Sequence, residues 1–369
     1  MASRACVSTA TVSRVVHGLD RVKDSTRARV LEVIAELGYV PDSAAQSLSR
    51  RRKEVIGLVC VERTSPKLQY DIEAMSLLFY DEVLRGVEAT IRDLGWSLMI
   101  TYVNHDSESD LPRLMSLSGK VDGLLIGEGI VPPEIVARLV ERIPVVLVAG
   151  NPRERVADVV TADNRTGAMA LAEHLITAHG LRRFHFVDGP ANAPDASERR
   201  RALMSVLRAN PDCQLSGSSP GLFSVVSGAE AGQLLLAEPQ LPDVVFCAND
   251  QMAIGVLQSL TRAGVAVPDQ VAVVGFDDIF PGSLCDPPLT TVHNPIRLLG
   301  ERACTLLLDR IAKPDLRPRV ESLPTELVLR SSCGCPPGTN IRRPLQRQRG
   351  RSGQAKTLTS RALPAAGIS

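Results

Sequence analysis

Short apolar runs alternate with amphipathic segments from Val55 to about residue 335, and this alternation constrains the fold most. A first series contains IGLVCV, LMITYV, DGLLIG and PVVLVAG, and a second series contains FHFVDG, VVFCAN and VAVVGFDD. Segments with helical periodicity separate the runs, each of which has about the length of one buried strand. Continuous apolar strands separated by helices are typical of parallel sheets that are covered on both faces. The two series therefore predict two doubly wound parallel-sheet subdomains.

Polar residues directly follow several of these runs. The sequence has Asn151 after one run, and the pairs Asn249-Asp250 and Asp277-Asp278 after two others. In doubly wound sheets, ligands bind beyond the carboxyl ends of the strands. We therefore expect these side chains to converge in a ligand-binding cleft.

The chain before Pro41 is predicted to form short helices. Ser8 can cap a helix that runs from Thr9 to about His17, and valines at helical spacing give this helix one apolar face. A second apolar-periodic helix ends before Pro41, and a basic run follows at residues 50–53.

Charge is unevenly distributed along the chain, although the net charge is only +1. Residues 1–53 hold ten Lys or Arg and five Asp or Glu, residues 336–369 hold seven Lys or Arg and no acid, and residues 54–335 are therefore net −11. Basic ends on an acidic middle indicate a polyanionic partner, although a solvated charged surface is the better interpretation of the C-terminal end. No apolar stretch of membrane-spanning length and no signal-peptide core occur, so we expect a cytoplasmic protein without a membrane partner.

The segment VSTATVSRVVH at residues 7–17 resembles the recognition helix of the LacI/GalR family of bacterial transcription regulators. The resemblance continues through the turn Tyr39-Val40-Pro41 and the hinge segment AAQSL at residues 44–48, and it covers essentially residues 2–335. It implies an α-helical helix-turn-helix head and an α/β sensor of two doubly wound, periplasmic-binding-protein-like subdomains. The implied boundaries are 1–41 for the head, 42–54 for the hinge, 55–335 for the effector-binding and dimerisation domain, and 336–369 for a disordered basic tail. Within the sensor, the subdomains are 55–159 with 293–319 and 160–290 with 320–335.

The resemblance also implies DNA contacts, and the chemistry of the residues suits them. Thr9 and Ala10 can contact a thymine methyl, and Arg14 can bond bidentately to guanine in the major groove. The hydroxyl groups of the same segment suit phosphates, and Leu48 matches a hinge leucine that wedges into the minor groove. A core role is the alternative for the helix and for Leu48. The predicted DNA-binding residues are Ser8, Thr9, Ala10, Thr11, Ser13, Arg14 and Leu48.

In the sensor, Arg199 of Ser197-Glu198-Arg199 resembles an effector-binding arginine of the family, and Asn249 and Asp277 match further effector-contacting positions. Planar Asn, Asp and Arg groups bind hydroxyls or a carboxylate through paired hydrogen bonds. Capping of loops is the alternative role for the Asn and Asp residues, and core packing is the alternative for the aromatic ones. The predicted effector-binding residues are Phe79, Asn151, Asp163, Arg199, Phe223, Asn249, Asp250 and Asp277.

No catalytic motif of the Walker A, G-x-S-x-G or G-x-G-x-x-G type is present, so we expect neither an enzyme nor a cofactor. Cys333 and Cys335 form a C-x-C pair, but no second ligand pair with zinc spacing accompanies it, and no metal is expected. The resemblance implies a homodimeric repressor that binds a pseudo-palindromic operator under control of a sugar or related metabolite. A solute-binding protein without a DNA role, an enzyme on a doubly wound fold, and a regulator with a defective head are the alternatives.

The first helix departs from the family pattern. Residues Met1–Cys6 match only the second half of the family's first helix, so we expect a truncated helix whose missing part is encoded upstream or a weakened head. Cys6 stands where the family has a helix-ending glycine. Because such positions often need a positive φ, a cysteine there is expected to cost about 1 kcal/mol.

Overall fold

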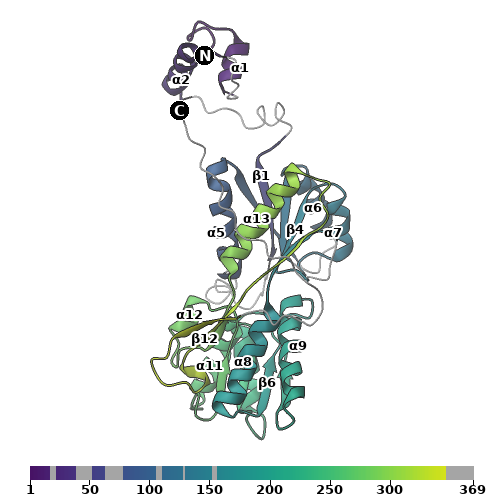
Figure 1. Ribbon diagram of the computed structural model, residues 1–369, viewed down its shortest axis with the longest axis vertical. Helices are drawn as coiled ribbons and strands as arrows, with labels where there is room; N and C mark the ends of the chain where they lie inside the picture. The colour runs from purple at the N-terminus through teal and green to yellow at the C-terminus, as the bar shows by residue number, and fades with distance from the viewer. Residues whose placement is uncertain are drawn as a thin grey trace.

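The structure is a computed structural model that describes residues 1–16, 22–38, 52–62, 78–104, 110–127, 129–151 and 156–345. The described residues form a helical head and two α/β units, which Figure 1 shows in sequence colours. No helix within these ranges is long and apolar enough to cross a membrane.

The head consists of one turn at residues 1–6 followed by α1 (Thr9–Val16) and α2 (Asp24–Glu36). Val12 and Val15 of α1 are buried against Val30 and Val33 of α2. The valine spacing read from the sequence therefore gives the apolar face of α1. This core is small, so strain or a lost contact at a single residue removes a large fraction of the free energy of unfolding of the head.

The first α/β unit contains a six-stranded parallel sheet in the order β11-β5-β4-β3-β1-β2. Its strands are β1 (Val55–Glu62), β2 (Ser97–Asn104), β3 (Gly123–Gly127), β4 (Val145–Val148), β5 (Asp158–Ala162) and β11 (Val320–Leu323). One face packs on α5 (Leu78–Ile91) and α13 (Ile296–Ala312), and the other on α6 (Asp110–Ser118) and α7 (Pro133–Val140) (Figure 1). A short helical turn, η1 (Arg92–Leu94), follows α5.

Successive residues of β1 show why both faces of this sheet are apolar. Leu58 packs with α5 and α13, whereas its neighbour Val59 packs with α6 and α7. Side chains alternate between the two faces of a strand, so a strand buried on both faces must be apolar at every position.

The second α/β unit contains a four-stranded parallel sheet in the order β7-β6-β8-β9. Its strands are β6 (Arg183–Val187), β7 (Gln214–Ser219), β8 (Val244–Cys247) and β9 (Ala272–Val274). Its helices are α8 (Asn164–His179), α9 (Pro194–Ala209), α10 (Val225–Leu236), α11 (Asp250–Arg262) and α12 (Phe280–Ser283). Helix α8 packs on α9, and α10 packs on α11. The two predicted doubly wound sheets are therefore confirmed.

A small antiparallel sheet, in the order β10-β12-β13, packs on α8 of the second unit. It is formed by β10 (Thr291–His293), β12 (Glu326–Leu329) and β13 (Ile341–Pro344), and η2 (Ser331–Cys333) lies between the last two strands. The chain passes between the two α/β units three times, at residues 162–164, 293–296 and 323–326.

Three predicted boundaries differ from the structure. β5 and β11 pair with each other in the first sheet. The predicted division at 159/160 therefore cuts through β5, and the division at 319/320 assigns β11 to the wrong unit. The predicted disordered tail from residue 336 is wrong over residues 336–345, because β13 is paired to β12 and Arg342 bonds Asp278 at 2.6 Å. The reason is that so short and basic a stretch shows no apolar alternation, so its pairing with β12 leaves no signal in the sequence.

Candidate functional site

A pocket opens between the two α/β units, at the carboxyl ends of their strands. The first unit contributes the loop after β4 and one residue of β5, and the second contributes the start of α8 and one side of α9. The lining residues are Gly150, Asn151, Thr161, Asn164, Pro194, Asp195, Glu198 and Arg201. This is the location that the sequence predicted for a ligand cleft, and Asn151 lines it as expected.

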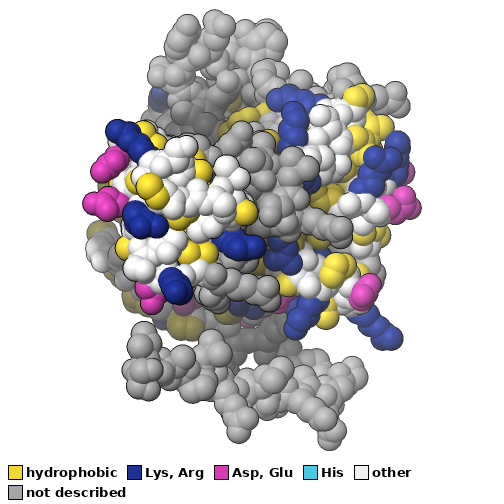
Figure 2. Space-filling view, turned by 90° about the horizontal axis from the view of Figure 1, so that it is seen from above, with side chains coloured by type: hydrophobic (Ala, Val, Ile, Leu, Met, Phe, Trp, Pro, Cys, Tyr) yellow, Lys and Arg dark blue, Asp and Glu magenta, His cyan; other side chains and the backbone are white. Residues whose placement is uncertain are grey.

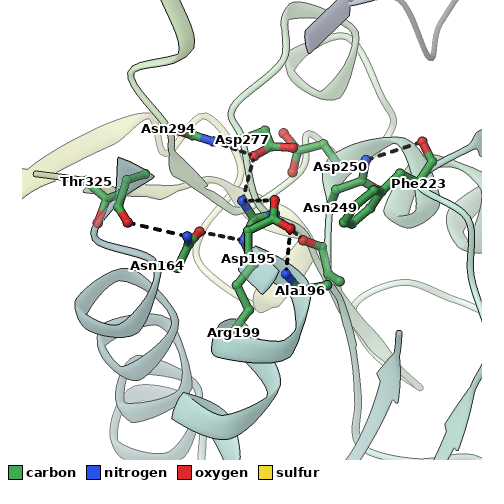
Figure 3. A network of polar contacts seen from close by, with 12 residues as sticks. Asn164, Asp195, Ala196, Arg199, Phe223, Asn249, Asp250, Asp277, Asn294 and Thr325 are labelled. Carbon is green, nitrogen blue, oxygen red and sulfur yellow. Dashed lines mark hydrogen bonds and ion pairs between the residues drawn. The ribbon is translucent and has the colours of Figure 1, made fainter. Parts of the chain in front are cut away.

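Arg199 lies at the centre of a polar network that includes the pocket residues Asn164 and Asp195 (Figure 3). Its side chain is only 2% exposed, and its guanidinium lies 3.8 Å from the centre of the Phe276 ring. Its Nε donates to Asn164 Oδ1 at 2.8 Å, and one terminal nitrogen donates to the Ala248 carbonyl at 2.6 Å. Because Asn164 lines the pocket and Arg199 does not, the structure places Arg199 as a positioning residue. Direct contact between Arg199 and a ligand stays a prediction.

Asp277 pairs with Arg199 and ties the central crossover to it. The second terminal nitrogen of Arg199 lies 3.3 Å from Asp277 Oδ1 and 3.4 Å from Asp195, and Asn294 donates to the same Asp277 oxygen at 3.0 Å. Burial raises the pKa of Asp277, and the neighbouring Arg199 opposes this shift. Asn294 belongs to the crossover at 293–296, so the Arg199–Asp277 pair is bonded directly to a connection between the two α/β units.

Asn249 and Asp250 have capping and bracing roles in the structure. Asn249 Oδ1 accepts from the Met252 amide at 3.0 Å and thereby caps α11. Asp250 is buried and accepts from Thr291 Oγ1 at 2.5 Å and from the Ile279 amide at 2.9 Å. Burial, with a contribution from Asp277, raises the pKa of Asp250 to about 7. Neither residue lines the pocket, and a ligand contact from either stays a prediction.

The remaining predicted effector residues occupy three different environments. Asp163 caps α8 by accepting from the Thr166 amide at 3.1 Å, and it lies next to the pocket residue Asn164. Phe79 packs edge-on against Tyr80, with ring centroids 5.5 Å apart, in the core of the first unit. Phe223 lies against Gly189 beyond the end of β6, where a Cβ on Gly189 would stand 2.7 Å from the ring.

Sequence reasoning missed most of the polar pocket wall on α9. Asp195, Glu198 and Arg201 line the pocket at intervals of three residues, which places them on one side of the helix. Burial raises the pKa of Glu198. This polar stripe was visible in the sequence, but a stripe of charged residues on a helix is also the pattern of an ordinary solvated face.

Backbone strain is concentrated at the same edge of the sheets. Ala149, Phe223, Asp277 and Asp278 have positive φ angles of 58°, 57°, 115° and 57°. Such conformations are costly for residues with a Cβ and cluster at ligand-binding sites. Their position supports the location of the functional cleft.

The exposed face of α1 is a second candidate site. Thr9, Ala10, Ser13 and Arg14 are exposed along this helix, opposite the buried valines. Lys and Arg (dark blue) are more frequent than Asp and Glu (magenta) among the described residues on the face seen in Figure 2. The predicted base-facing residues are therefore on the accessible side of their helix.

Ser8 and Thr11 are bonded to each other and to the helix end. Ser8 Oγ accepts from the Thr11 amide at 3.1 Å and lies 2.9 Å from Thr11 Oγ1. The predicted helix cap is confirmed, whereas phosphate contacts from both hydroxyls stay predictions. Leu48 lies outside the described residues.

The turn before α1 ends at Cys6, whose φ is +49°. The Cys6 amide donates to Ser3 O at 3.3 Å, and the Val7 amide donates to Ala2 O at 3.1 Å. These two bonds form the helix-ending motif in which glycine is usual, so the expected positive φ is confirmed.

Cys333 and Cys335 have a second ligand pair beside them, contrary to the expectation from the sequence. The sequence shows no second ligand pair near them, but the structure places His174 and His179 of α8 beside both sulfurs. The two pairs come from segments more than 150 residues apart in the chain, which is why spacing rules did not find them.

Comparison with family models gives two matches. Residues 1–42 match the model for bacterial regulatory proteins of the lacI family, and residues 172–333 match a periplasmic binding protein-like domain. The curated relatives include the ribose operon repressor of Escherichia coli K12, which is 32% identical over 90% of this chain and 98% of the repressor. The transcriptional repressor PurR of Aliivibrio fischeri MJ11 is 30% identical over 90% of this chain and 96% of that protein.

Solved structures give the same result over nearly the whole chain. The lac repressor dimer bound to operator and the anti-inducer ONPF aligns with a TM-score of 0.79 and 26% identity, covering 90% of this chain and 97% of the repressor chain. The transcriptional regulator CelR in complex with cellobiose aligns with a TM-score of 0.66 and 31% identity, covering 90% of this chain and 98% of CelR.

Proposed function

Because the chain belongs to the lacI family of bacterial regulatory proteins, and is therefore a DNA-binding transcription regulator, we propose how its described residues perform that role. The pocket around Asn164 and α9 binds a neutral, polyhydroxylated effector, a sugar or a nucleoside. The exposed face of α1 reads the operator, and the effector controls operator affinity. The observation that carries this proposal is a polar pocket whose walls come from both α/β units.

The composition of the pocket supports a neutral polyol. Its walls offer amide groups from Asn151 and Asn164, carboxylates from Asp195 and Glu198, and one guanidinium from Arg201. A hydroxyl group both donates and accepts, so it can bond to each of these groups. An anionic effector would be repelled by the two carboxylates and attracted by the one guanidinium, so this pocket suits a neutral ligand better. One relative is named as the repressor of a ribose operon, and CelR is solved in complex with the sugar cellobiose, which also supports this class.

Coupling to DNA follows from the position of the pocket at the crossovers. A ligand that bonds to both walls favours the state in which the two units are close together, and it shifts the equilibrium only by its differential affinity for that state. Asn192 Nδ2 already donates to Gly129 O across this cleft at 2.5 Å. Arg199 and Asp277 bond the pocket floor to the crossover at Asn294, so closure changes the geometry of that connection.

We propose that the working form is a homodimer on a pseudo-palindromic operator, since the two-fold symmetry of a dimer is mirrored in its site. The lac repressor, to which the chain is similar, is solved as a dimer bound to operator. Phe280 and Leu284, at either end of α12, are 74% and 69% exposed. Two large apolar side chains so close together on a surface suit self-association. The named relatives are regulators, and we accordingly propose that the cleft binds its ligand without catalysis.

A ligand screen tests the effector proposal. Thermal shift is measured on the full chain with a panel of pentoses, hexoses, cellobiose and nucleosides. A true effector at 100 times its dissociation constant should stabilise the protein by about 2.7 kcal/mol. Isothermal titration of the best ligand then compares Arg201→Ala with Arg208→Ala, an exposed arginine further along α9 that does not line the pocket.

We expect Arg201→Ala to weaken binding at least tenfold and Arg208→Ala to leave it unchanged. Binding that is equally strong in both variants would contradict the assigned pocket. A ligand that binds the chain but leaves its operator affinity unchanged would contradict the proposed coupling.

A further inference from the structure

Four metal-ligating side chains converge at the end of α8 farthest from the effector pocket. His174 and His179 lie in the last turns of α8, Cys333 ends η2, and Cys335 follows two residues later. One ligand atom from each residue lies within 4.8 Å of the corresponding atoms of the other three. None of these residues lines the effector pocket or belongs to the α1 face.

The distances between these atoms fit the edges of one tetrahedron. Cys333 Sγ lies 3.8 and 3.6 Å from Nε2 of His174 and His179, and Cys335 Sγ lies 3.6 and 3.5 Å from the same two atoms. The two Nε2 atoms are 3.1 Å apart. With Zn–S of about 2.3 Å and Zn–N of about 2.0–2.1 Å, tetrahedral geometry puts sulfur and nitrogen about 3.6 Å apart and two nitrogens about 3.4 Å apart.

The backbone between the two cysteines is shaped for this convergence. Gly334 has a φ of +103°, and a Cβ at this position would stand 3.1 Å from Nδ1 of His179. A side chain here would be strained by the backbone conformation and crowded by the imidazole ring. The glycine turns the chain so that the sulfurs of Cys333 and Cys335 both face the two histidines.

The surroundings also resemble those of an enclosed metal site. Cys333 is buried, and the other three residues are partly buried. Thr290 Oγ1, which is fully buried, lies 3.1 Å from Cys333 Sγ and donates to the Arg330 carbonyl at 2.7 Å, so the sulfur has a polar neighbour away from solvent. Without a cation, two imidazole nitrogens 3.1 Å apart share at most one proton between them.

We propose that His174, His179, Cys333 and Cys335 bind one Zn²⁺ ion. Two sulfurs and two imidazole nitrogens in tetrahedral arrangement select zinc among the common divalent cations. Each thiol loses its proton to solvent as its sulfur coordinates, and the two thiolates balance the charge of the ion. Because the protein supplies all four ligands, no position is left open for a substrate, and the site is structural.

The ion would tie the C-terminal segment to α8. Residues 331–335 lead from β12 to β13, which pairs only with β12 in the small sheet, and α8 carries Asn164 of the pocket at its other end. Coordination therefore fixes the last part of the second unit onto the helix that begins at the effector site.

The test uses the full chain, purified under reducing conditions from cells supplied with zinc chloride. Bound metal is measured by inductively coupled plasma mass spectrometry after desalting, in wild type, Cys335→Ser and Cys285→Ala. Cys285 is a partly buried cysteine outside the cluster and serves as the matched control. We expect about one zinc per chain in wild type and Cys285→Ala, and a loss of at least tenfold in Cys335→Ser.

Two measurements on wild type keep the test decisive if Cys335→Ser fails to fold. Release of zinc with an organomercurial reagent and a chelator should lower the melting temperature, and zinc chloride alone should restore it. Replacement by Co²⁺ should give the visible bands and the near-ultraviolet thiolate band of a tetrahedral site. Less than one tenth of a zinc per chain in wild type, a Cys333–Cys335 disulfide in the reduced preparation, or equal zinc in the Cys335→Ser protein would overturn the proposal.

Discussion

Replacement of Cys6 by glycine should stabilise the DNA-binding head. Cys6 holds a left-handed backbone conformation, with φ of +49°, at the end of the first turn. A residue with a Cβ pays about 1 kcal/mol for this conformation, and glycine does not. The apolar core of the head consists of a few small residues, so this gain is a large fraction of its local stability.

Amide hydrogen exchange on the intact chain measures this effect locally. Peptides covering α1 (Thr9–Val16) and α2 (Asp24–Glu36) should exchange about five times more slowly in Cys6→Gly, because 1 kcal/mol changes the opening equilibrium by about that factor. Cys6→Ala is the matched control, since it removes the thiol and keeps the Cβ. Peptides of the two α/β units should not change in either variant.

The outcome separates backbone strain from the chemistry of the thiol. If Cys6→Ala slowed exchange as much as Cys6→Gly, the thiol and not the backbone would be responsible, and the strain argument would fail. Equal exchange in all three proteins would refute it as well.

Three further predictions concern the DNA face, a buried ion pair and the oligomeric surface. Arg14→Ala should cost about 1–3 kcal/mol on the cognate operator and relax specificity, and a titration with equal loss on random DNA would contradict a base contact. Asp278→Asn should destabilise the protein by about 3 kcal/mol, because it leaves the buried Arg330, now 2.6 Å from Asp278, without a charge partner. Burial opposes ionisation of Asp278, but the hydrogen bonds from its partners lower its pKa below the ordinary value of 3.8. The stabilisation by the Asp278 carboxylate is therefore present above pH 3.8 and lost as pH falls below it. Urea unfolding of both proteins from pH 7 to 3 should show that the difference in their free energies of unfolding shrinks. Phe280→Asp should shift the chain from dimer to monomer in analytical ultracentrifugation, whereas Leu234→Asp, which alters another exposed leucine, should not.

The local architecture was predictable from sequence because it depends on periodicity over a few residues. The alternation of apolar runs and helices gave two covered parallel sheets, and Val12 and Val15 gave the buried face of α1. Ser8 as a cap and Cys6 as a left-handed helix end were also readable, since both depend on bonds within four or five residues.

The sequence was less informative about how the site is built. It predicted that Asn151, Arg199 and Asp277 belong to one effector site, and Asn151 lines the pocket. It did not show that Arg199 is buried beneath Asn164 or that α9 forms the pocket wall. These facts depend on how α8 and α9 pack against each other, which no local pattern encodes.

Long-range pairing was decided by tertiary structure alone. β5 and β11 are adjacent in the first sheet although about 160 residues separate them, and β13 pairs with β12 in a segment predicted to be disordered. By itself the sequence determined which segments are strands and helices, which faces they bury, and to which family the chain is similar. Only the folded structure brought His174 and His179 to Cys333 and Cys335, because such clusters form when separate apolar faces are buried in one core, and side chains at their edges meet as a consequence.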